Sequence, residues 1–191
     1  MRCVFSWIYT YNIILHYVIE IGGSRDKSQF GDIIERARMA QDSIGGVVEC
    51  RVCGIPAGCG EPFFDSVESE VAHLLFSVPA VKGVEFGAGF SSAKMCGSEH
   101  NDAIIDKDGH TATNHSGGVV GGITNGNQLI VRAAIKPTAS ISREQQTFNF
   151  ASGKVEPLVI KGRHDVCIAL RAAVVIEAAI AIALADLKLR A

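Results

Sequence analysis

Aromatic side chains and an excess of basic charge are both scarce in this sequence. Phe, Trp and Tyr together make up 7% of the 191 residues, too few for the stacking platforms that hold single-stranded nucleic acid. The 18 Lys and Arg residues are outnumbered by 20 Asp and Glu, so the formal net charge is −2. Duplex nucleic acid requires clustered cations. We therefore expect no nucleic-acid partner, and a cytoplasmic protein that acts on a small molecule.

A complete set of metal ligands is also missing. Cys50 and Cys53 form a Cys-x-x-Cys pair and Cys59 follows, but no second pair of cysteines or histidines closes a four-ligand site. A chain of this length can bury an ample core, so its six cysteines do not by themselves indicate disulfides. We expect buried thiols that pack as small apolar side chains, and no metal.

Residues 3–19 contain no charged side chain and differ from the rest of the sequence. They lack the uniform apolar block and the small-residue cleavage site of a signal peptide, because four polar residues interrupt them: Ser6, Thr10, Asn12 and His16. A buried strand is the favoured interpretation. A membrane anchor and an unnatural start of the gene are the alternatives.

The remaining sequence alternates between helix-like and strand-like stretches. Helices are predicted at 32–41, 66–78 and 166–187, strands at 47–52, 81–86 and 129–135, and a hairpin at 147–150 and 155–160. In the predicted strand 47–52, the alternating charged residues Glu49 and Arg51 predict one solvent-exposed face. The last helix is apolar nearly all round, which predicts burial between layers, and its charges exclude a membrane span. We expect an α+β protein with helices packed between sheets.

Three clusters could bind a ligand. The run 115–126 contains two Gly-Gly pairs, which allow positive φ and let backbone N–H groups approach a ligand. A Gly-rich turn between strands is the alternative. The run Lys136-Pro137-Thr138-Ala139-Ser140 offers one cation and two hydroxyls on a proline-stiffened backbone, suited to a phosphate or a flavin edge. Its alternative is a solvated strand end.

The third cluster, 161–165, comes just before the last predicted helix. Arg163 could hold an anion beside the helix N-terminus, where the free N–H groups carry a positive dipole. Asp165 is either the N-cap of that helix or a group that moves protons. His164 is a second candidate base, although a structural role is the commoner one for a single histidine.

Taken together, these clusters resemble chorismate synthase. The matching runs are Asp42–Gly46, Gly54–Gly58 with Gly60–Pro62, Ala80–Glu85 with Gly87–Phe90, Asn101-Asp102, His115–Gly126, Lys136–Ser140 and Gly162–Asp165. Their order and spacing hold from about residue 28 to the C-terminus. The resemblance therefore divides the chain into an atypical segment, 1–27, and a C-terminal chorismate synthase portion, 28–191.

The resemblance implies a lyase of the shikimate pathway of aromatic amino acid biosynthesis. Members of the family convert 5-enolpyruvylshikimate 3-phosphate to chorismate and phosphate with reduced FMN, and NADP is associated with them. The family fold is a layered sandwich of sheets around helices, assembled as a homotetramer. Position by position, the resemblance implies an acid–base role for Asp165 and FMN contacts at Ala80, Gly121, Lys136, Pro137, Thr138, Ala139, Ser140 and Arg163.

The resemblance covers only the C-terminal half of the family pattern. The N-terminal half carries a Gly-x-Ser-His-Gly stretch with a catalytic histidine, an Arg-Ser-Ser-type segment and the arginines that hold the substrate. None of these is found here: only Arg2 and Arg25 precede Arg36. Two readings follow. Either the activity belongs to an intact protein of which this is the C-terminal portion, or the chain is a non-catalytic remnant that retains part of the FMN site or the subunit interface.

Overall fold

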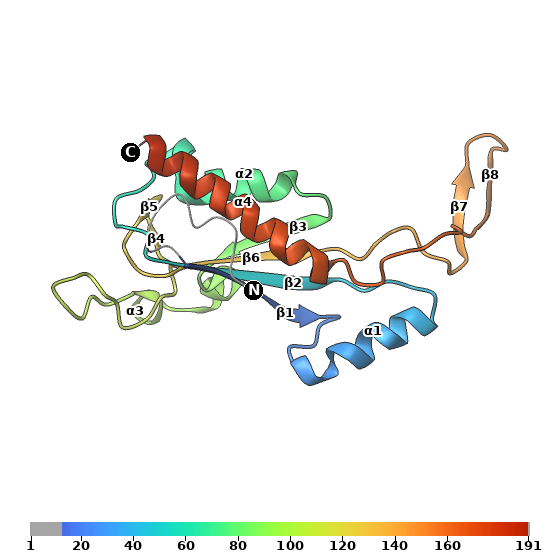
Figure 1. Ribbon diagram of the computed structural model, residues 1–191, viewed down its shortest axis with the longest axis horizontal. Helices are drawn as coiled ribbons and strands as arrows, with labels where there is room; N and C mark the ends of the chain where they lie inside the picture. The colour runs from blue at the N-terminus through green and yellow to red at the C-terminus, as the bar shows by residue number, and fades with distance from the viewer. Residues whose placement is uncertain (1–12, 191) are drawn as a thin grey trace.

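The computed structural model describes residues 13–190 and centres on a four-stranded antiparallel sheet (Figure 1). The order of the strands is β1 (Ile13–Ile21), β2 (Gly46–Cys53), β6 (Leu129–Ile135), β3 (Val81–Phe86). All three neighbouring pairs are antiparallel. In β2, Val48, Cys50 and Val52 are fully buried, as expected for alternate residues on the covered face of a sheet.

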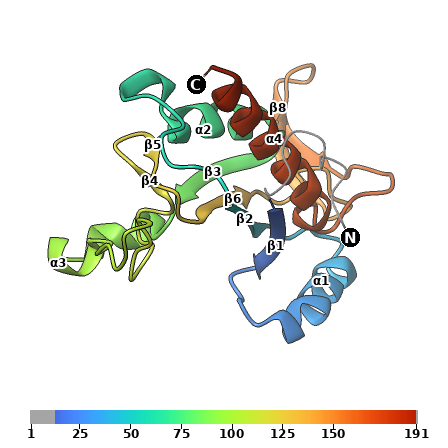
Figure 2. The ribbon, with the colours of Figure 1, turned by 60° about the vertical axis from the view of Figure 1, so that its left-hand side comes forward.

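Two helices cover that face of the sheet. They are α2 (Val67–Ser77) and α4 (Ala169–Arg190), which lie side by side in Figures 1 and 2 and pack against each other. Ser66 begins α2 as an N-cap, its hydroxyl accepting the N–H of Ser69. The core lies between this helix layer and the sheet, and its largest fully buried side chains are Ile21, Leu75, Leu129, Ile176 and Ile180.

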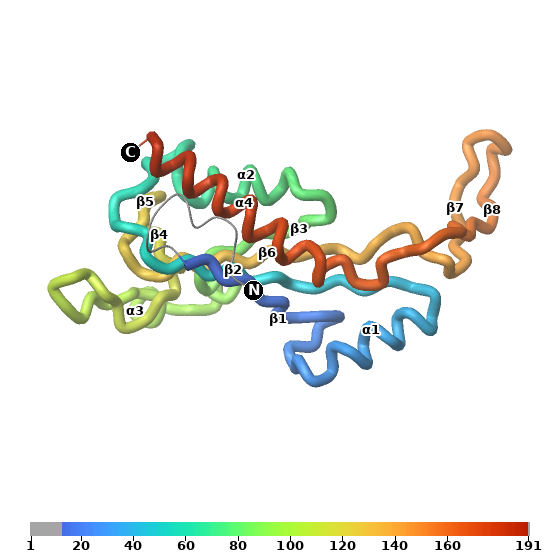
Figure 3. Tube along the Cα trace, in the orientation of Figure 1, coloured from blue at the N-terminus to red at the C-terminus, as the bar shows by residue number. Residues whose placement is uncertain are grey.

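The smaller elements surround this unit. Helix α1 (Phe30–Met39) lies on the other side of the sheet from α4 (Figure 1). The short elements are η1 (Lys27–Gln29), η2 (Phe63–Asp65), η3 (Gly89–Lys94), α3 (Gly97–His100), β4 (Val119–Val120) and β5 (Ile123–Thr124). The hairpin of β7 (Gln145–Asn149) and β8 (Lys154–Leu158) projects away from the sheet, as the tube in Figure 3 shows.

The α+β class is confirmed, as are the predicted helices, strands and hairpin. Of the expected sandwich, residues 13–190 contain one sheet of more than two strands and one helix layer. Helix α4 is therefore not enclosed between two sheets. It begins at Ala169, three residues later than predicted, and its outer side is exposed.

Two expectations about the sheet need correction. Glu49 does not face solvent, because it is only 3% exposed. The N-terminal strand is confirmed for Ile13–Ile21, but it is an edge strand, and Ile13, Leu15 and Tyr17 remain exposed on the face opposite α4. The first part of the charge-free stretch, 3–12, lies outside the described residues.

Candidate functional site

The carboxyl end of β6 brings one of the predicted clusters, Lys136–Ser140, next to Ala80, another predicted FMN contact. The N–H of Lys136 donates to the carbonyl oxygen of Ala80, with an N···O distance of 2.9 Å. Ala80 has a φ of +74°, a left-handed conformation that is uncommon outside glycine. We call Ala80 and the run Lys136–Ser140 the lysine end of the sheet.

The segment Asp42–Gly46 connects the lysine end to the third cluster. The Ser43 hydroxyl donates to the Thr138 carbonyl oxygen at 2.6 Å, and the N–H of Ile44 donates to the carbonyl oxygen of Val166 at 2.8 Å. Residue 166 directly follows Asp165. Two predicted site segments far apart in sequence are thus tied to one short segment before β2.

Polar side chains at the lysine end lack ion-pair or hydrogen-bond partners within the described part of the protein. Lys136 is exposed, and within residues 13–190 no carboxylate pairs with its ammonium group or with the Arg163 guanidinium. The Oγ1 atom of Thr138 is buried and has no hydrogen-bond partner. The exposed Lys136 cation and the orphaned Thr138 hydroxyl of one run can bind an anionic ligand such as a phosphate.

Asp165 is not the N-cap of α4, because the helix begins four residues later. Its carboxylate instead forms an ion pair with Arg171 of the first helical turn, with an N···O distance of 3.0 Å. His164 is half-buried, and its Nε2 hydrogen-bonds the carbonyl oxygen of Ile160 at 2.9 Å. The structural role is therefore the better supported one for His164.

Gly121 lies at the opposite end of β6. With Gly122 it forms the two-residue turn between β4 and β5, both glycines having positive φ, as primed hairpin turns require. The seven residues of β6 separate this turn from Lys136, a span of roughly 20 Å at about 3.3 Å per residue. A Cβ at Gly121 would meet nothing within 4 Å, so its backbone is open to a ligand, but not to one held at the lysine end of the same chain.

We call the run His115–Gly126, together with Asp102, which hydrogen-bonds its first residues, the glycine end. Asp102 is its main support, accepting from the N–H of His115 at 2.7 Å, from the N–H of Ser116 at 2.9 Å and from the Thr113 hydroxyl at 2.8 Å. Burial alone would raise the pKa of Asp102, but these hydrogen bonds, led by that of the Ser116 N–H, outweigh it and hold the pKa below its usual value. An ionised Asp102 therefore fixes the start of the run.

The sequence did not reveal a buried ion network on the outer face of the sheet. The Glu49 carboxylate accepts from Nε of Arg51 and from Nε of Arg132, both at 2.7 Å, and Arg132 also donates to the Gly87 carbonyl oxygen at 2.6 Å. The alternating charges of β2 were visible, but the pairing of Glu49 with Arg132 depends on the register of β2 and β6. The network joins the middle of the sheet to the glycine end.

A second buried carboxylate lies on the helix side of the sheet. Glu177 of α4 is 4% exposed and pairs with Nδ1 of His16 on β1. Burial, followed by the charges of Glu177 and Glu49, raises the pKa of the Cys50 thiol to about 12. Cys50 is therefore a protonated core thiol at neutral pH rather than a nucleophile.

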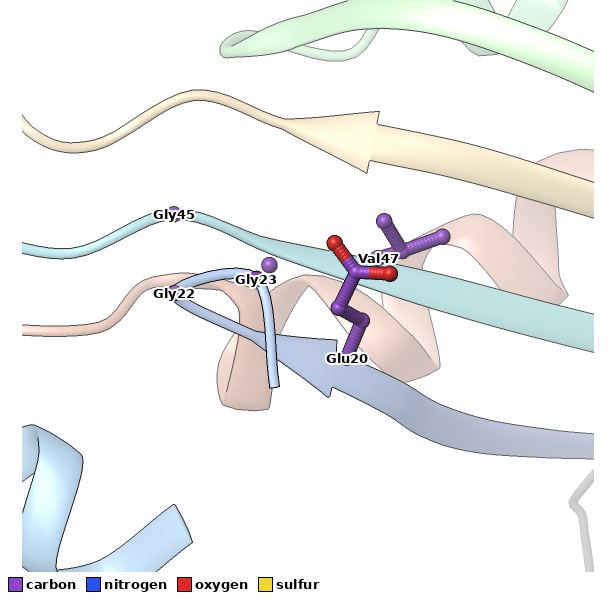
Figure 4. A pocket seen from close by; sticks show the side chains of 6 residues that line it. Glu20, Gly22, Gly23, Gly45 and Val47 are labelled. Atoms are coloured by element: carbon purple, nitrogen blue, oxygen red, sulfur yellow. The ribbon is translucent and has the colours of Figure 1, made fainter. Parts of the chain in front are cut away.

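A hollow of about 220 Å³ lies beside the lysine end (Figure 4). It is lined by Glu20, Gly22, Gly23, Gly45, Gly46 and Val47, with the Glu20 carboxylate beside Val47. Gly45 connects it to the site: a Cβ there would lie 2.7 Å from the Ile135 carbonyl oxygen and 3.2 Å from Cδ of Pro137. None of the predicted site residues lines this hollow, and it is smaller than a typical ligand pocket of roughly 300–1,000 Å³.

The described part of the chain offers neither a metal centre nor a spanning helix. No three His, Cys, Asp or Glu side chains among residues 13–190 are grouped so that they could hold a metal ion. The five cysteines of that range are free thiols. No helix within it is long and apolar enough to cross a membrane.

Comparisons with known proteins point to one family. The sequence model for chorismate synthase matches residues 15–189. A chorismate synthase of Chitinophaga pinensis is 61% identical over 170 residues, which are 89% of this chain and 50% of that protein. One of Opitutus terrae is 48% identical over 155 residues, 80% of this chain and 42% of that protein. A crystal structure of chorismate synthase matches the fold with a TM-score of 0.74 at 27% identity, covering 94% of this chain and 57% of the other.

Two facts about these matches bear on the site. The chain spans about half the length of the curated relatives it matches. The family match begins at residue 15, inside the segment 1–27, so residues 15–21 of β1 belong both to the matched region and to the sheet.

Proposed function

The chain belongs to the chorismate synthase family, and from this premise we propose that it supplies the FMN-binding C-terminal part of that enzyme. The proposed reaction converts 5-enolpyruvylshikimate 3-phosphate to chorismate and phosphate. It is an anti-1,4-elimination, in which one C–O bond and one C–H bond break. We place the enzyme in the cytoplasm as a homo-oligomer, the tetramer being the assembly that the family implies.

The observation that carries this proposal is the orphaned hydroxyl of Thr138. Its Oγ1 is buried without a hydrogen-bond partner among the described residues, a situation that costs about 1–3 kcal/mol. A ligand with a polar group at this position would remove that cost. Thr138 belongs to the Lys136–Ser140 run, in which the family resemblance implies FMN contacts.

The backbone of Ala80 gives separate support. A left-handed φ at a non-glycine residue costs about 1–3 kcal/mol and is concentrated at functional sites. At Ala80 this conformation occurs where its carbonyl oxygen accepts the N–H of Lys136. A strained residue beside an exposed cation fits a built ligand site better than a plain strand end.

Each residue of the site then has a role that follows from its chemistry. Lys136, Thr138 and Arg163 would hold reduced FMN, and the cofactor would supply one-electron chemistry for the elimination without net oxidation or reduction. The Lys136 ammonium and the Arg163 guanidinium bind anionic groups, and the hydroxyls of Thr138 and Ser140 orient them through hydrogen bonds. The Asp165 carboxylate, held by Arg171, accepts or returns a proton near the flavin.

Gly121 does not join this cluster within one chain. The length of β6 separates it from the lysine end. We retain it as a flavin contact only across a subunit boundary of the proposed homo-oligomer, where a second copy can present its open backbone.

Titration of FMN against the chain, followed by flavin fluorescence, tests the binding part of the proposal. We expect Lys136→Met and Thr138→Val each to weaken FMN binding at least tenfold, and riboflavin, which lacks the phosphate, to bind weakly to every variant. Lys154→Met in the projecting hairpin is the matched control and should bind FMN like the parent chain. Equal FMN binding by the parent and by both site variants would contradict the assignment of Lys136–Ser140.

The second candidate function is that of a remnant which binds FMN without catalysis. The absence of the family's Gly-x-Ser-His-Gly stretch and of its Arg-Ser-Ser-type segment from the 191 residues motivates it. Anaerobic mixing of the chain with reduced FMN and 5-enolpyruvylshikimate 3-phosphate separates the two, with a full-length relative as the positive control. Chorismate from the chain alone would contradict the need for the N-terminal half. FMN binding without chorismate would leave the chain as the binding half.

A further inference from the structure

We infer that Ser43 is a positioning residue for the ligand at the lysine end. Its hydroxyl fixes the backbone of Thr138, and the Thr138 hydroxyl is thereby held in the direction of the ligand instead of turning to a protein partner. The inference rests on the proposed function, because FMN is the ligand whose affinity it concerns. Ser43 acts through Thr138 and is assigned no contact with the ligand.

The two oxygens of Thr138 have opposite environments. The carbonyl oxygen accepts the Ser43 hydroxyl at 2.6 Å, near the short end of the usual O···O range of roughly 2.5–3.0 Å. The side-chain Oγ1 is buried and has no hydrogen-bond partner among residues 13–190. The protein thus holds the backbone of this residue and leaves its hydroxyl available.

Holding the backbone of Thr138 also holds its hydroxyl. A carbonyl group fixed in one orientation fixes ψ of its own residue, and the χ1 rotamers open to a side chain depend on φ and ψ. Threonine is branched at Cβ and is therefore stiff at χ1. Pro137 restricts the run just before it, since the ring fixes φ. The hydrogen bond from Ser43 consequently sets the direction of the Thr138 Cβ–Oγ1 bond.

Ser43 is itself held by its neighbours. Its N–H donates to Oδ1 of Asp42 at 2.8 Å, and Oδ2 of that carboxylate pairs with Arg143 at 3.1 Å. The N–H of Arg143 donates to the carbonyl oxygen of Gln41 at 3.0 Å. The segment 41–43 therefore bonds the chain both at Thr138 and five residues beyond it.

Strained backbone occurs where other residues hold this part of the chain. Among residues 13–190, positive φ at a residue other than glycine is found at Gln41, Phe63 and Ala80. Two of these three accept hydrogen bonds from the chain after β6, Ala80 from the N–H of Lys136 and Gln41 from that of Arg143. Such conformations persist only where the surrounding structure imposes them, and they are concentrated at ligand sites.

Packing, in addition to hydrogen bonding, keeps Ser43 close to Thr138. A Cβ at Gly45 would lie 2.7 Å from the Ile135 carbonyl oxygen and 3.2 Å from Cδ of Pro137. Only a glycine lets the segment before β2 come this near to the end of β6. On its other side, the segment is held by the hydrogen bond from the N–H of Ile44 to the Val166 carbonyl oxygen.

A double-mutant cycle on the whole chain tests the inference. Ser43→Ala should weaken FMN binding about tenfold, the loss expected for one hydrogen bond, as measured by flavin fluorescence. In the Thr138→Val background the same substitution should weaken binding no further, because no hydroxyl remains to be oriented. Ser43→Thr keeps the donor and should bind FMN like the parent chain.

Thr111→Val is the matched control. It removes a hydroxyl that also donates to a backbone carbonyl oxygen at 2.6 Å, that of Thr113, but in a different part of the chain. Its affinity for FMN should equal that of the parent.

NMR provides a readout that needs no flavin. Three-bond couplings from the γ-methyl carbon of Thr138 to its backbone nitrogen and carbonyl carbon report χ1. We expect a single rotamer in the parent chain and in Ser43→Thr, and an average over rotamers in Ser43→Ala. A purely structural contribution of Ser43 to the fold would leave this rotamer unchanged.

Two outcomes would overturn the inference. One is a single Thr138 rotamer in Ser43→Ala. The other is an equal loss of FMN affinity when Ser43→Ala is added to the parent and to Thr138→Val, because Ser43 would then act on the site as a whole. A parent chain that bound no FMN would contradict the proposed function, and the couplings would still decide whether Ser43 orients the Thr138 hydroxyl.

Discussion

The glycine end and the lysine end of β6 differ in how completely the chain satisfies them. At the glycine end, Asp102 receives two backbone N–H groups, and the Thr124 hydroxyl donates to the Pro56 carbonyl oxygen while accepting the N–H of Cys59. At the lysine end, Thr138 keeps an orphaned hydroxyl, and Lys136 has no acidic partner within residues 13–190.

We propose that this difference separates structural residues from binding residues. A segment whose polar groups are paired internally stabilises the fold, and substitutions there should lower the free energy of unfolding. At the lysine end, where Thr138 keeps an unpaired hydroxyl, we expect substitutions to change FMN affinity instead. The predictions below test this division, beginning with the largest expected effect.

Gly87→Ala should cause the largest loss of stability. Gly87 has a φ of +55°, and a Cβ there would lie 2.1 Å from the His115 carbonyl oxygen. Backbone strain and the clash with main-chain atoms that cannot move freely should lower the free energy of unfolding by about 3 kcal/mol or more. Urea denaturation followed by circular dichroism measures this loss.

Gly97→Ala is the control for that experiment. A Cβ at Gly97 meets nothing within 4 Å, and the residue lies in the short helix α3. Its urea midpoint should equal or exceed that of the parent chain. If Gly87→Ala unfolded at the same urea concentration as Gly97→Ala, the glycine end would not be the rigid part of the molecule.

Asp102→Asn should lower the free energy of unfolding by about 1–2 kcal/mol at pH 7, because the amide keeps only one acceptor oxygen and no charge for the three donors. The lowered pKa of Asp102 sets the pH dependence. Its contribution is complete above the pKa of the unfolded chain, about 3.9, and is lost as the pH falls through the lower pKa of the folded state.

The difference in stability between parent and Asp102→Asn should thus be constant from pH 7 to 5 and shrink below about pH 4. Urea titrations at several pH values measure it. A difference that grew on acidification would mean that Asp102 is protonated in the folded protein.

The sequence predicted the helices and strands of this fold better than the burial or exposure of their side chains. Periodicity located α2, β2, β3, β6 and the hairpin because each depends on local pattern and turn residues. The burial of Glu49 could not be predicted, since its partner Arg132 lies 83 residues away and meets it only through the strand register. The exposed face of α4 was also missed, because an all-round apolar helix indicates burial without indicating what buries it.

The sequence likewise predicted one part of the candidate site and could not predict the rest. The motifs located Lys136–Ser140 and Arg163–Asp165, and in the structure the Asp42–Gly46 segment hydrogen-bonds Thr138 and Val166, the residue after Asp165. Sequence order alone could not show that Gly121 lies at the other end of a seven-residue strand from Lys136. Nor could it reveal the orphaned hydroxyl of Thr138, which depends on tertiary packing.

Gly121→Ala should have a smaller effect on stability than Gly122→Ala. Both glycines have positive φ, so each substitution costs about 1 kcal/mol for the left-handed backbone. A Cβ at Gly122 would also lie 2.7 Å from the Glu61 carbonyl oxygen, whereas one at Gly121 meets nothing within 4 Å. Thermal unfolding of the two variants should rank Gly121→Ala closer to the parent chain. The reverse ranking would contradict the open position assigned to Gly121.

Lys136→Met should have the smallest effect on stability, within about 0.5 kcal/mol of the parent chain. The side chain is exposed and pairs with no carboxylate in the described residues, and the N–H that binds the Ala80 carbonyl oxygen is kept in the variant. Urea denaturation of this variant, set beside its FMN titration, compares the two properties in one protein. Unchanged stability with at least tenfold weaker FMN binding would establish the lysine end as a binding site whose cation contributes nothing to folding. A loss of stability as large as that of Asp102→Asn would instead make both ends of β6 structural, because Lys136 would then be satisfied by the chain itself.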